Sequence, residues 1–532
     1  MAEANSYAID FGTSNTVITR WNNSTQTPEI VEIGDFCQKN PDVPPLIPSL
    51  LYLKDASKGE VLIGQQVCDR GLDLSNDPRF FRAFKKGIGA EVQGFLPQLD
   101  GKTITFEQIG TLYLQQIINK LRDTVSEPID SLVLTVPVDS FEVYRIWLTE
   151  LCRSLDIERV RTIDEPTAAA LAYGIKEAST ILVFDFGGGT VDLSLIELES
   201  IATNQGFILK WGAKMLGESS AQKPQIAKVI AKAGQNLGGS DIDNWLVDYF
   251  VQKQNISKSS LVTRLAERLK IKLSYQNEAT EAYFDDETLQ SYELSLDRDS
   301  FGRLLSSRKL FSQLDELLNK IAQQARRSAV EITNIDRVVL VGGSVQLPQV
   351  KTWIEERFAK TQIEQEQPLT AVASGALQVA KGIEVKDFLY HSYGIRYWNR
   401  REKRHSWHPL IKSGQPYPMA QSVNLTLGAS VENQPYIELV VGEMGSDSVA
   451  TEVYFDGDRL VTRSLDSQMT VKPLNDTDTA KTLARLEPLG QPGSDRVELR
   501  FQVDDDCLLR VTVEDLLTEE LLIDSQVIAQ LK

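Results

Sequence analysis

The sequence predicts an α/β fold of two related halves, followed by a separate domain made mostly of β-strands. Two segments, Ala8–Asn15 and Val183–Thr190, are variants of one motif: an apolar strand reaches an aspartate and turns through glycine and hydroxyl residues into a second strand. Strands and helices alternate from residue 7 to about 385, as expected for α/β architecture. Beyond about residue 393 apolar and polar residues alternate with a period of two, as in 497–503, which predicts β-strands.

Both turns have the chemistry of a phosphate site. A tight turn through Gly12–Asn15 or Gly187–Thr190 points several backbone N–H groups into one concavity. The glycines allow close approach of the backbone, and the aspartates Asp10 and Asp185 can hold a hydrated Mg²⁺ over the phosphates. One such turn occurs by chance in many hairpins. Two of them, each at the end of a buried strand, predict duplicated halves that bind a nucleotide from both sides.

A third element has a related pattern. The buried strand Val338–Val341 runs into Gly342-Gly343-Ser344, and a helical stretch follows at Val350–Phe358. Ligands of open α/β sheets bind at the carboxyl ends of the strands, where a glycine turn that opens a helix suits a phosphate or a ribose. Further helices are expected at 144–155, 168–173, 255–275 and 310–333.

Composition and charge exclude several classes of protein. A chain of 532 residues needs at least two domains, and its net charge of −18 argues against nucleic-acid binding. No signal region or membrane span is predicted, so we expect a cytoplasmic protein without a membrane partner. The four cysteines are far apart, which indicates neither disulfides nor a zinc site. All three histidines lie beyond residue 390, so chemistry near Asp10 and Asp185 must proceed without a histidine base.

Together these motifs resemble the seventy-kilodalton heat-shock chaperones of the DnaK class, which have the actin-like ATPase fold. The resemblance runs from Tyr7 to about Lys381, and its motifs separate the chain from actins and sugar kinases. It is carried by Ile9–Asn15, Asp164–Ala170, Phe184–Thr190, Leu237–Asp241, Glu267–Ser274 and Val341–Ser344. It implies an actin-like nucleotide-binding domain at 1–384, an interdomain linker at 385–392, and a β-sandwich peptide-binding domain at 393–532. Because the sequence ends at Lys532, the helical lid of the family is expected to be missing.

The resemblance also implies the cofactors ATP or ADP and Mg²⁺, with K⁺ as a further candidate, and a role for each matching residue. Lys85 corresponds to the lysine that reaches the transferred phosphoryl group, and Glu165 to the carboxylate that orients the attacking water. Taken alone, Lys85 could be a surface lysine and Glu165 a charge at a helix N-terminus. The implied catalytic residues are Asp10, Lys85, Glu165, Asp185 and Thr190, and the implied metal-side carboxylates are Asp10, Asp185 and Asp192. The implied nucleotide contacts are Gly12, Thr13, Ser14, Asn15, Gly187, Gly188, Gly189, Gly238, Gly239, Glu267, Lys270, Ser274, Gly342, Gly343, Ser344 and Gln346.

By the same resemblance, the expected partners are unfolded or extended polypeptides, a J-domain co-chaperone and a nucleotide exchange factor. Interdomain coupling is assigned to Pro137, Arg145 and Asp387, and peptide binding to Leu410, Ile411, Val423 and Leu425. The chain departs from the family pattern at three places. Gln346 replaces an arginine that packs against the adenine, Trp398–Leu410 is basic and aromatic where the family is apolar, and Gly217–Ala233 is an apparent insertion with apolar residues at helical spacing.

Three functions are compatible with these observations. The first is an ATP-hydrolysing, lidless chaperone, and the second is a nucleotide-gated binding module with little turnover that serves one dedicated partner. The third is an actin-like filament protein or a sugar kinase, which the appended β-domain and the helix at Glu267–Ser274 disfavour.

Overall fold

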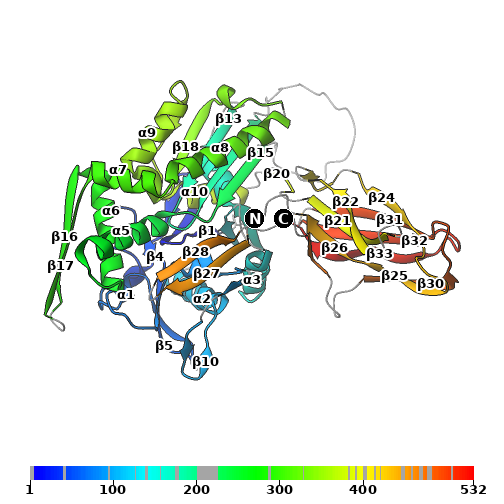
Figure 1. Cartoon of the computed structure of the whole chain (residues 1–532), viewed down its shortest axis with the longest axis horizontal. Coiled ribbons are helices and arrows are strands. Elements are labelled where there is room, and N and C mark those ends of the chain that lie inside the picture. Colours follow the sequence, from blue (N-terminus) through cyan, green and yellow to red (C-terminus); the bar gives the residue numbers. More distant parts are fainter. Residues whose placement is uncertain are drawn as a thin grey trace. The chain divides into compact units, whose positions relative to one another are not determined.

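The computed structural model divides the chain into two compact units (Figure 1). The first contains residues 1–385 and 451–463, and the second contains 386–450 and 464–532. Residues 451–463, which the sequence analysis placed in the C-terminal domain, thus belong to the first unit, where β27 (Ala450–Asp456) pairs with β8 (Val92–Gln93). The described residues are 5–531 without 40–42, 91, 94–95, 126, 138–141, 156, 158, 174–178, 200–225, 286–288, 328, 381–383, 390–391, 400–403, 413–414, 420, 445–449, 457–458, 466–470, 476–481 and 505–506.

The first half of the first unit (residues 5–172) is built on one mixed sheet. Its strands follow the order β12 (Arg159–Asp164), β11 (Ser131–Val136), β1 (Ser6–Phe11), β2 (Asn15–Asn22) and β3 (Thr27–Ile30), and β4 (Ile47–Pro48) also pairs with β2. β1 runs parallel to β11 and antiparallel to β2, while β11 runs parallel to β12. Every residue of β11 is buried, Ser131 and Thr135 included, as expected for a strand paired on both sides by parallel neighbours.

The second half (residues 179–380) repeats this arrangement. Its sheet has the order β19 (Gln362–Glu364), β18 (Arg337–Val341), β13 (Ser179–Phe186), β14 (Val191–Glu199) and β15 (Ile226–Gln235). β13 runs parallel to β18 and antiparallel to β14, and β18 runs parallel to β19. Strand order and direction are therefore the same in both halves, which confirms the duplication predicted from the two turn motifs.

Two short, alanine-rich helices join the halves. α4 (Glu165–Ala172) and α10 (Ala371–Ala380) pack against each other, and both contribute to one buried cluster with strands of the two sheets. A Cβ atom added to Gly375 of α10 would lie 1.7 Å from the carbonyl oxygen of Ala168 in α4. The helices can approach this closely only because glycine stands at their crossing.

The remaining helices follow the predicted pattern but differ at their ends. α6 (Ser260–Tyr275) begins later than predicted because Asn255, with a φ of 53°, ends α5 (Gly239–Gln254), and the Ser259 side chain then accepts from the N–H of Val262. α8 (Leu310–Arg327) ends before the predicted residue 333 because Ala329 has a φ of 59° and the N–H of Val330 donates to the carbonyl of Ala325. The other helices are η1 (Gly34–Phe36), α1 (Gln65–Cys68), η2 (Phe84–Gly87), α2 (Phe106–Thr124), α3 (Glu142–Arg153), α7 (Arg298–Ser307), η3 (Ile332–Asn334), η4 (Gly343–Gln346) and α9 (Pro348–Arg357).

The helical prediction for the inserted segment is wrong where it can be compared with the structure. Ile226–Ala233 lies in β15, which pairs antiparallel with β14 and contacts α8 (Figure 1). Val229 and Ile230 are buried in this strand. Their spacing fits a helix as well as a strand, and pairing with the edge of the sheet decides between the two. The rest of the segment, 217–225, lies outside the described residues.

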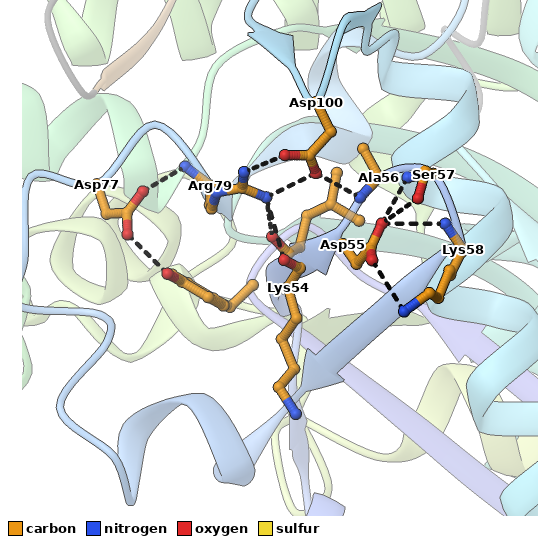
Figure 2. A network of polar contacts seen from close by, with 10 residues as sticks. Lys54, Asp55, Ala56, Ser57, Lys58, Asp77, Arg79 and Asp100 are labelled. Atoms are coloured by element: carbon orange, nitrogen blue, oxygen red, sulfur yellow. Dashed lines mark hydrogen bonds and ion pairs between the residues drawn. The ribbon is translucent and has the colours of Figure 1, made fainter.

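A polar network secures the chain just before Lys85 (Figure 2). Arg79 donates to the carbonyls of Leu53 and Lys54 and pairs with Asp100, which also accepts from the N–H of Ala56. The network thereby ties the end of β5 (Leu50–Asp55) to the turn between β9 (Gln98–Leu99) and β10 (Lys102–Thr103). Arg79 directly precedes β7 (Phe80–Arg82), which pairs with β5 and leads into η2; β6 (Glu60–Ile63) is the third strand of this sheet.

The second unit consists of β-sheets around its own core. One four-stranded sheet has the order β22 (Arg404–Ile411), β21 (Ser392–Asn399), β26 (Val441–Met444) and β29 (Val471–Pro473). The other has the order β24 (Val423–Leu427), β31 (Val497–Val503), β32 (Leu508–Asp515) and β33 (Leu521–Gln530). Both sheets contribute to a single hydrophobic cluster, together with the pair β25 (Gln434–Leu439) and β30 (Thr482–Gly490). The predicted alternation at 497–503 is observed, because the odd positions of β31 are buried.

A buried ion pair closes one end of the second sheet. Arg496 donates twice to the carboxylate of Asp515, at 2.8 and 2.7 Å. The same carboxylate accepts from the N–H groups of Leu517 and Thr518. Burial raises the pKa of Asp515, but the bonds from Arg496 and from the backbone outweigh it, and the pKa lies below its ordinary value.

Two predictions about the C-terminal region need correction. The expected linker at 385–392 begins inside a strand, β20 (Glu384–Phe388), whose last residues pair with β23 (Pro416–Tyr417). Leu410 and Ile411, predicted to contact peptide, are buried in the core, and Val423 and Leu425 pack against that core. The side chains of Leu410 and Ile411 therefore belong to the core, whereas Val423 and Leu425 are only partly buried, and their role in peptide binding stays a prediction.

The remaining strands are β16 (Glu278–Asp285), β17 (Gln290–Asp297) and β28 (Arg459–Leu465). β16 and β17 form a two-stranded hairpin that packs on α6. Among the described residues, no helix combines the length and the apolar character that crossing a bilayer would require.

Candidate active site

One cavity of about 630 Å³ in the first unit collects the motif residues of both halves. Of the predicted site residues, it is lined by Asp10, Gly12, Thr13, Ser14, Asn15, Lys85, Glu165, Asp185, Gly187, Gly188, Gly189, Thr190, Gly239, Glu267, Lys270, Ser274, Gly342, Gly343, Ser344 and Gln346. Two predicted residues lie just behind its wall. Asp192 pairs with Asp185 across β13 and β14, and Gly238 precedes α5, where its N–H donates to Asp241.

The two turns have the same backbone geometry. In the first half the N–H of Gly12 donates to the carbonyl of Asn15 at 3.1 Å, and in the second half the N–H of Gly187 donates to the carbonyl of Thr190 at 3.0 Å. Each bond closes a turn between two antiparallel strands, and both turns line the cavity. The backbone of the two turns therefore faces the cavity with the same hydrogen-bonding pattern.

The turns also face each other at close range. A Cβ atom added to Gly188 would lie 2.1 Å from Oγ of Ser14, and one added to Gly189 would lie 2.2 Å from Oγ1 of Thr13. Any side chain at either glycine would force the halves apart. The glycines therefore allow two phosphate-type turns to meet in a single cavity.

Lys85 is the cation next to the carboxylates of the cavity. Its Nζ donates to Oε1 of Glu165 at 2.7 Å and lies 5.5 Å from the centre of the Phe11 ring. Burial lowers the pKa of Lys85, but the charges of Glu165 and Asp10 outweigh it and raise the pKa, so the side chain stays protonated. Glu165 begins α4, and this ion pair explains why its charge is buried at a helix N-terminus.

Asp185, at the end of β13, is buried, and Asp10, at the end of β1, is partly buried. Burial, followed by the charge of Glu165, raises the pKa of Asp10 to about 7, although Thr135 donates to it at 2.8 Å. Burial and the charges of Glu165, Asp192 and Asp10 raise the pKa of Asp185 well above its ordinary value. Carboxylates whose pKa values are raised by burial and by nearby negative charge favour a bound cation.

This donor set fits Mg²⁺. In the described part of the chain, no three His, Cys, Asp or Glu side chains form a complete metal-binding group. Mg²⁺ usually keeps several waters and is bound through one or two carboxylates together with the phosphates of a substrate. Asp10 and Asp185 supply carboxylates of that kind beside the two turns.

The cavity wall in the second half is formed by α5, α6 and η4. α5 begins at Gly239, so its N-terminus faces the cavity, as in anion-binding helices. Lys270 of α6 donates to the carbonyl of Gly239 and pairs with Asp243 at 2.8 Å. Ser344 of η4 donates to the carbonyl of Gly187 at 2.8 Å, which fixes the third glycine turn against the second.

The sequence matches the family model HSP70, whose description is "Hsp70 protein". The match covers residues 85–204 and 225–415, which is more than half of the chain. The chain belongs to the Hsp70 family. Members of this family have the actin-like ATPase fold, and they are ATPases that use a nucleotide and Mg²⁺. Membership accounts for the duplicated halves, and it supports an ATP-dependent, chaperone-type function in general terms.

The limits of the family match give different bounds for the insertion than the sequence pattern did. The match is interrupted between residues 204 and 225 and resumes before β15. The part that departs from the Hsp70 family is therefore 205–224, and 226–233 is a regular strand of the fold. Residues 205–224 lie outside the described part of the chain.

Sequence reasoning missed three ion pairs that join the halves of this Hsp70-family chain. Lys86 pairs with Asp241 at 2.8 Å, and Arg82 pairs with Glu267 at 3.2 Å. Arg264 pairs with Asp73 at 3.2 Å and also with Glu267 at 2.9 Å. Burial raises the pKa of Glu267, but the charges of Arg82, Arg264 and Lys270 outweigh it and lower the pKa to about 2.

Other cavity residues were also missed, although the sequence contained a signal for some of them. On α6 the lining residues Arg264, Glu267, Arg268, Ile271, Ser274 and Tyr275 recur at three- and four-residue spacing. This spacing marks one helix face, and it could have extended the predicted set to Arg264, Arg268, Ile271 and Tyr275.

Of the residues predicted to couple the domains, Pro137 is buried just after β11. The side chains of Arg145 and Asp387 lie outside the described part of the structure.

Proposed function

We propose that this chain is an ATP-hydrolysing chaperone in which the nucleotide in the cavity controls the binding of extended or unfolded polypeptide by the C-terminal unit. The observation that carries the proposal is the meeting of two glycine turns, two strand-end aspartates and one lysine–glutamate pair in a single cavity. A triphosphate needs backbone donors, a metal-side carboxylate and a cation at the transferred group, and these residues provide all three.

Each residue of the cavity has a role in hydrolysis that follows from its position. The backbone of 12–15 and 187–190 would bind the phosphates, and Asp10 and Asp185 would hold the Mg²⁺, which supplies positive charge to neutralise them. Lys85 directs its charge to the transferred phosphoryl group. Glu165, the carboxylate bonded to that lysine, orients the attacking water. Catalysis of this kind depends on position and charge, so it needs no histidine.

The C-terminal unit is proposed to be a β-sandwich that binds peptide as an added strand. Its two four-stranded sheets around one core support this proposal. We further propose a J-domain co-chaperone and a nucleotide exchange factor as partners, a cytoplasmic location, and coupling of the two units through Pro137, Arg145 and Asp387. K⁺ remains a proposed accompanying ion.

Single-turnover hydrolysis of radiolabelled ATP, with and without an unfolded polypeptide, tests this function. We expect slow, Mg²⁺-dependent hydrolysis in the wild type, acceleration by the polypeptide, and a loss of about a hundredfold or more in Asp185→Asn. Asp315→Asn is the matched control, because it removes the same charge from a surface pair with Arg357 outside the cavity. Equal rates in the wild type and Asp185→Asn would refute the active site.

The same experiment distinguishes the ATP-hydrolysing chaperone from the alternative function, a nucleotide-gated binding module. A nucleotide-gated module with little turnover would bind ATP and change its affinity for a partner without measurable hydrolysis. ATP binding without hydrolysis in the wild type would therefore favour that alternative over the chaperone cycle.

A further inference from the structure

Tyr144, in α3, is a buried side chain whose hydroxyl has no hydrogen-bond partner among the described residues. The residue is only 3% exposed. A buried tyrosine hydroxyl usually finds a partner, as Tyr113 of the same hydrophobic cluster does with Thr16 and with the carbonyl of Pro48. The unused donor therefore needs a physical reason, such as a group that reaches it in another state of the site.

Packing holds Tyr144 against the segment that carries Lys85. Its ring centre lies 5.3 Å from that of Trp147, whose indole N–H donates to the carbonyl of Glu107 in α2. A Cβ atom added to Gly89 would lie 2.5 Å from the backbone N of Tyr144 and 3.2 Å from its Cβ. α3 is therefore in direct contact with the chain that follows Lys85, and the tyrosine has little room to move.

The hydroxyl lies close to the charged groups of the cavity, but behind the cavity wall. Burial raises the pKa of Tyr144 to about 12, and the charges of Lys85, Glu165 and Asp10 also act on it, so the hydroxyl stays a donor at neutral pH. These three residues line the cavity, and Tyr144 does not. It therefore approaches the Lys85–Glu165 pair from the protein side.

The partner of Glu165 in this structure is a cation that has a second task. Lys85 donates to Glu165 at 2.7 Å, and in the proposed reaction it directs its charge to the transferred phosphoryl group. Glu165 is 7% exposed, and a buried carboxylate that loses its charge partner is left without compensation. A second donor is therefore needed at Glu165 during the reaction.

We propose that the Tyr144 hydroxyl is this second donor, which bonds to Glu165 when Lys85 turns to the phosphoryl group and keeps the carboxylate oriented toward the attacking water. The two side chains are not bonded in this structure, so the bond requires a rotation of the Glu165 side chain toward the hydroxyl. Because Tyr144 acts through Glu165, it is a positioning residue. The inference rests on the proposed ATP hydrolysis, which it deepens.

Tyr144→Phe tests the proposal, because it keeps the ring and its packing and removes only the hydroxyl. A hydrogen bond to a charged group is worth a factor of about 10 to 150, so single-turnover hydrolysis with the protein in excess over MgATP should slow by that factor. The MgADP affinity in calorimetry should stay within about twofold of the wild type, because the hydroxyl lies behind the cavity wall. The Tm should be unchanged or higher, since the variant removes a buried donor that is unpartnered among the described residues.

A double-mutant cycle with Glu165→Gln shows whether the hydroxyl acts through that carboxylate. In the Glu165→Gln background, Tyr144→Phe should change the remaining hydrolysis by less than about twofold. Tyr113→Phe is the matched control, because the hydroxyl of Tyr113 is also buried but already bonded. It should lower the Tm and leave hydrolysis within about threefold of the wild type.

The outcomes separate this role from a structural one and from the proposed function. Wild-type hydrolysis in Tyr144→Phe would overturn the positioning role, and so would an undiminished loss in the Glu165→Gln background. Slow hydrolysis together with a lower Tm and weaker MgADP binding would overturn it as well, because Tyr144 would then act on the fold alone. A wild-type chain that binds MgATP without hydrolysing it would refute the proposed hydrolysis, and the role of Tyr144 with it.

Discussion

Replacing Lys85 with methionine would remove the positive charge beside Glu165 while keeping most of the side-chain volume. The Nζ atom lies 2.7 Å from Glu165, and its charge also acts on Asp10 and Asp185. A donor aimed at developing transition-state charge is worth about 2.7–4 kcal/mol, or a factor of about 100 to 1,000 in kcat. We therefore expect Lys85→Met to lose hydrolysis by that factor.

The adjacent residue is the control. Lys86 is also buried and pairs with a carboxylate, Asp241, but it does not line the cavity. Removing one partner of a buried pair costs about 3–5 kcal/mol of stability. Both variants remove one partner of such a pair, so both should lose stability. Only Lys85→Met should also lose hydrolysis, because only Lys85 lines the cavity.

Single-turnover hydrolysis with the protein in excess over MgATP, together with the Tm of each variant, checks this expectation. Both variants should have a lower Tm, but only Lys85→Met should be slow. Lys86→Met should hydrolyse ATP within about threefold of the wild type, because the Arg82–Glu267 and Arg264–Asp73 pairs still join the halves. A Lys85→Met protein that hydrolyses ATP at the wild-type rate would refute the catalytic role of the lysine. So would equal losses in the two variants, because the effect would then follow stability alone.

Three further outcomes are expected. Asp515→Asn should lower the free energy of unfolding by about 3–5 kcal/mol at pH 7, because it leaves Arg496 buried without its charge partner. Because the pKa of Asp515 is lowered in the folded protein, the pair stabilises fully above the unfolded pKa of about 3.9, and this stabilisation is lost as the pH falls below that value. The stability of the wild type, measured against pH, should therefore show an acid step that the variant lacks. Gly375→Ala should lower the free energy of unfolding by about 1–3 kcal/mol or more, and the Tm with it, because its added Cβ clashes with Ala168. Gly302→Ala, in a helix where the added Cβ meets no atom nearer than 3.5 Å, should leave the Tm unchanged or raise it. Chelation of Mg²⁺ should weaken ATP binding in calorimetry, because the cavity is already lined by five acidic and five basic side chains and offers a triphosphate little net positive charge.

Local sequence patterns were sufficient to predict the parts of the site that lie on consecutive residues. The turns after β1 and β13 need glycine and a strand-end aspartate, and both requirements are visible in a few adjacent positions. The duplication followed, because two such turns imply two similar sheets. The sequence could not reveal that Gly188 meets Ser14, since this contact depends on how the halves are packed.

Errors arose where one pattern fits two structures. The spacing in Ile226–Ala233 fits a helix, but the segment extends a sheet. Leu410 and Ile411 are apolar, which suits a peptide groove and a core equally, and the structure places both in the core. In each case the missing information was which surface the residues pack against, and a linear pattern does not contain it.

Ion pairs that join distant residues were beyond prediction, yet they determine how the halves act together. Within one short segment, Arg79 is fixed to Asp100, Arg82 and Lys86 pair across to the second half, and Lys85 enters the cavity. Moving one half relative to the other would break the Arg82 and Lys86 pairs and shift the backbone that carries Lys85. The separation of the halves and the position of the lysine are therefore coupled mechanically. We therefore predict that a ligand bound to both turns would fix the separation of the halves and the position of that lysine together.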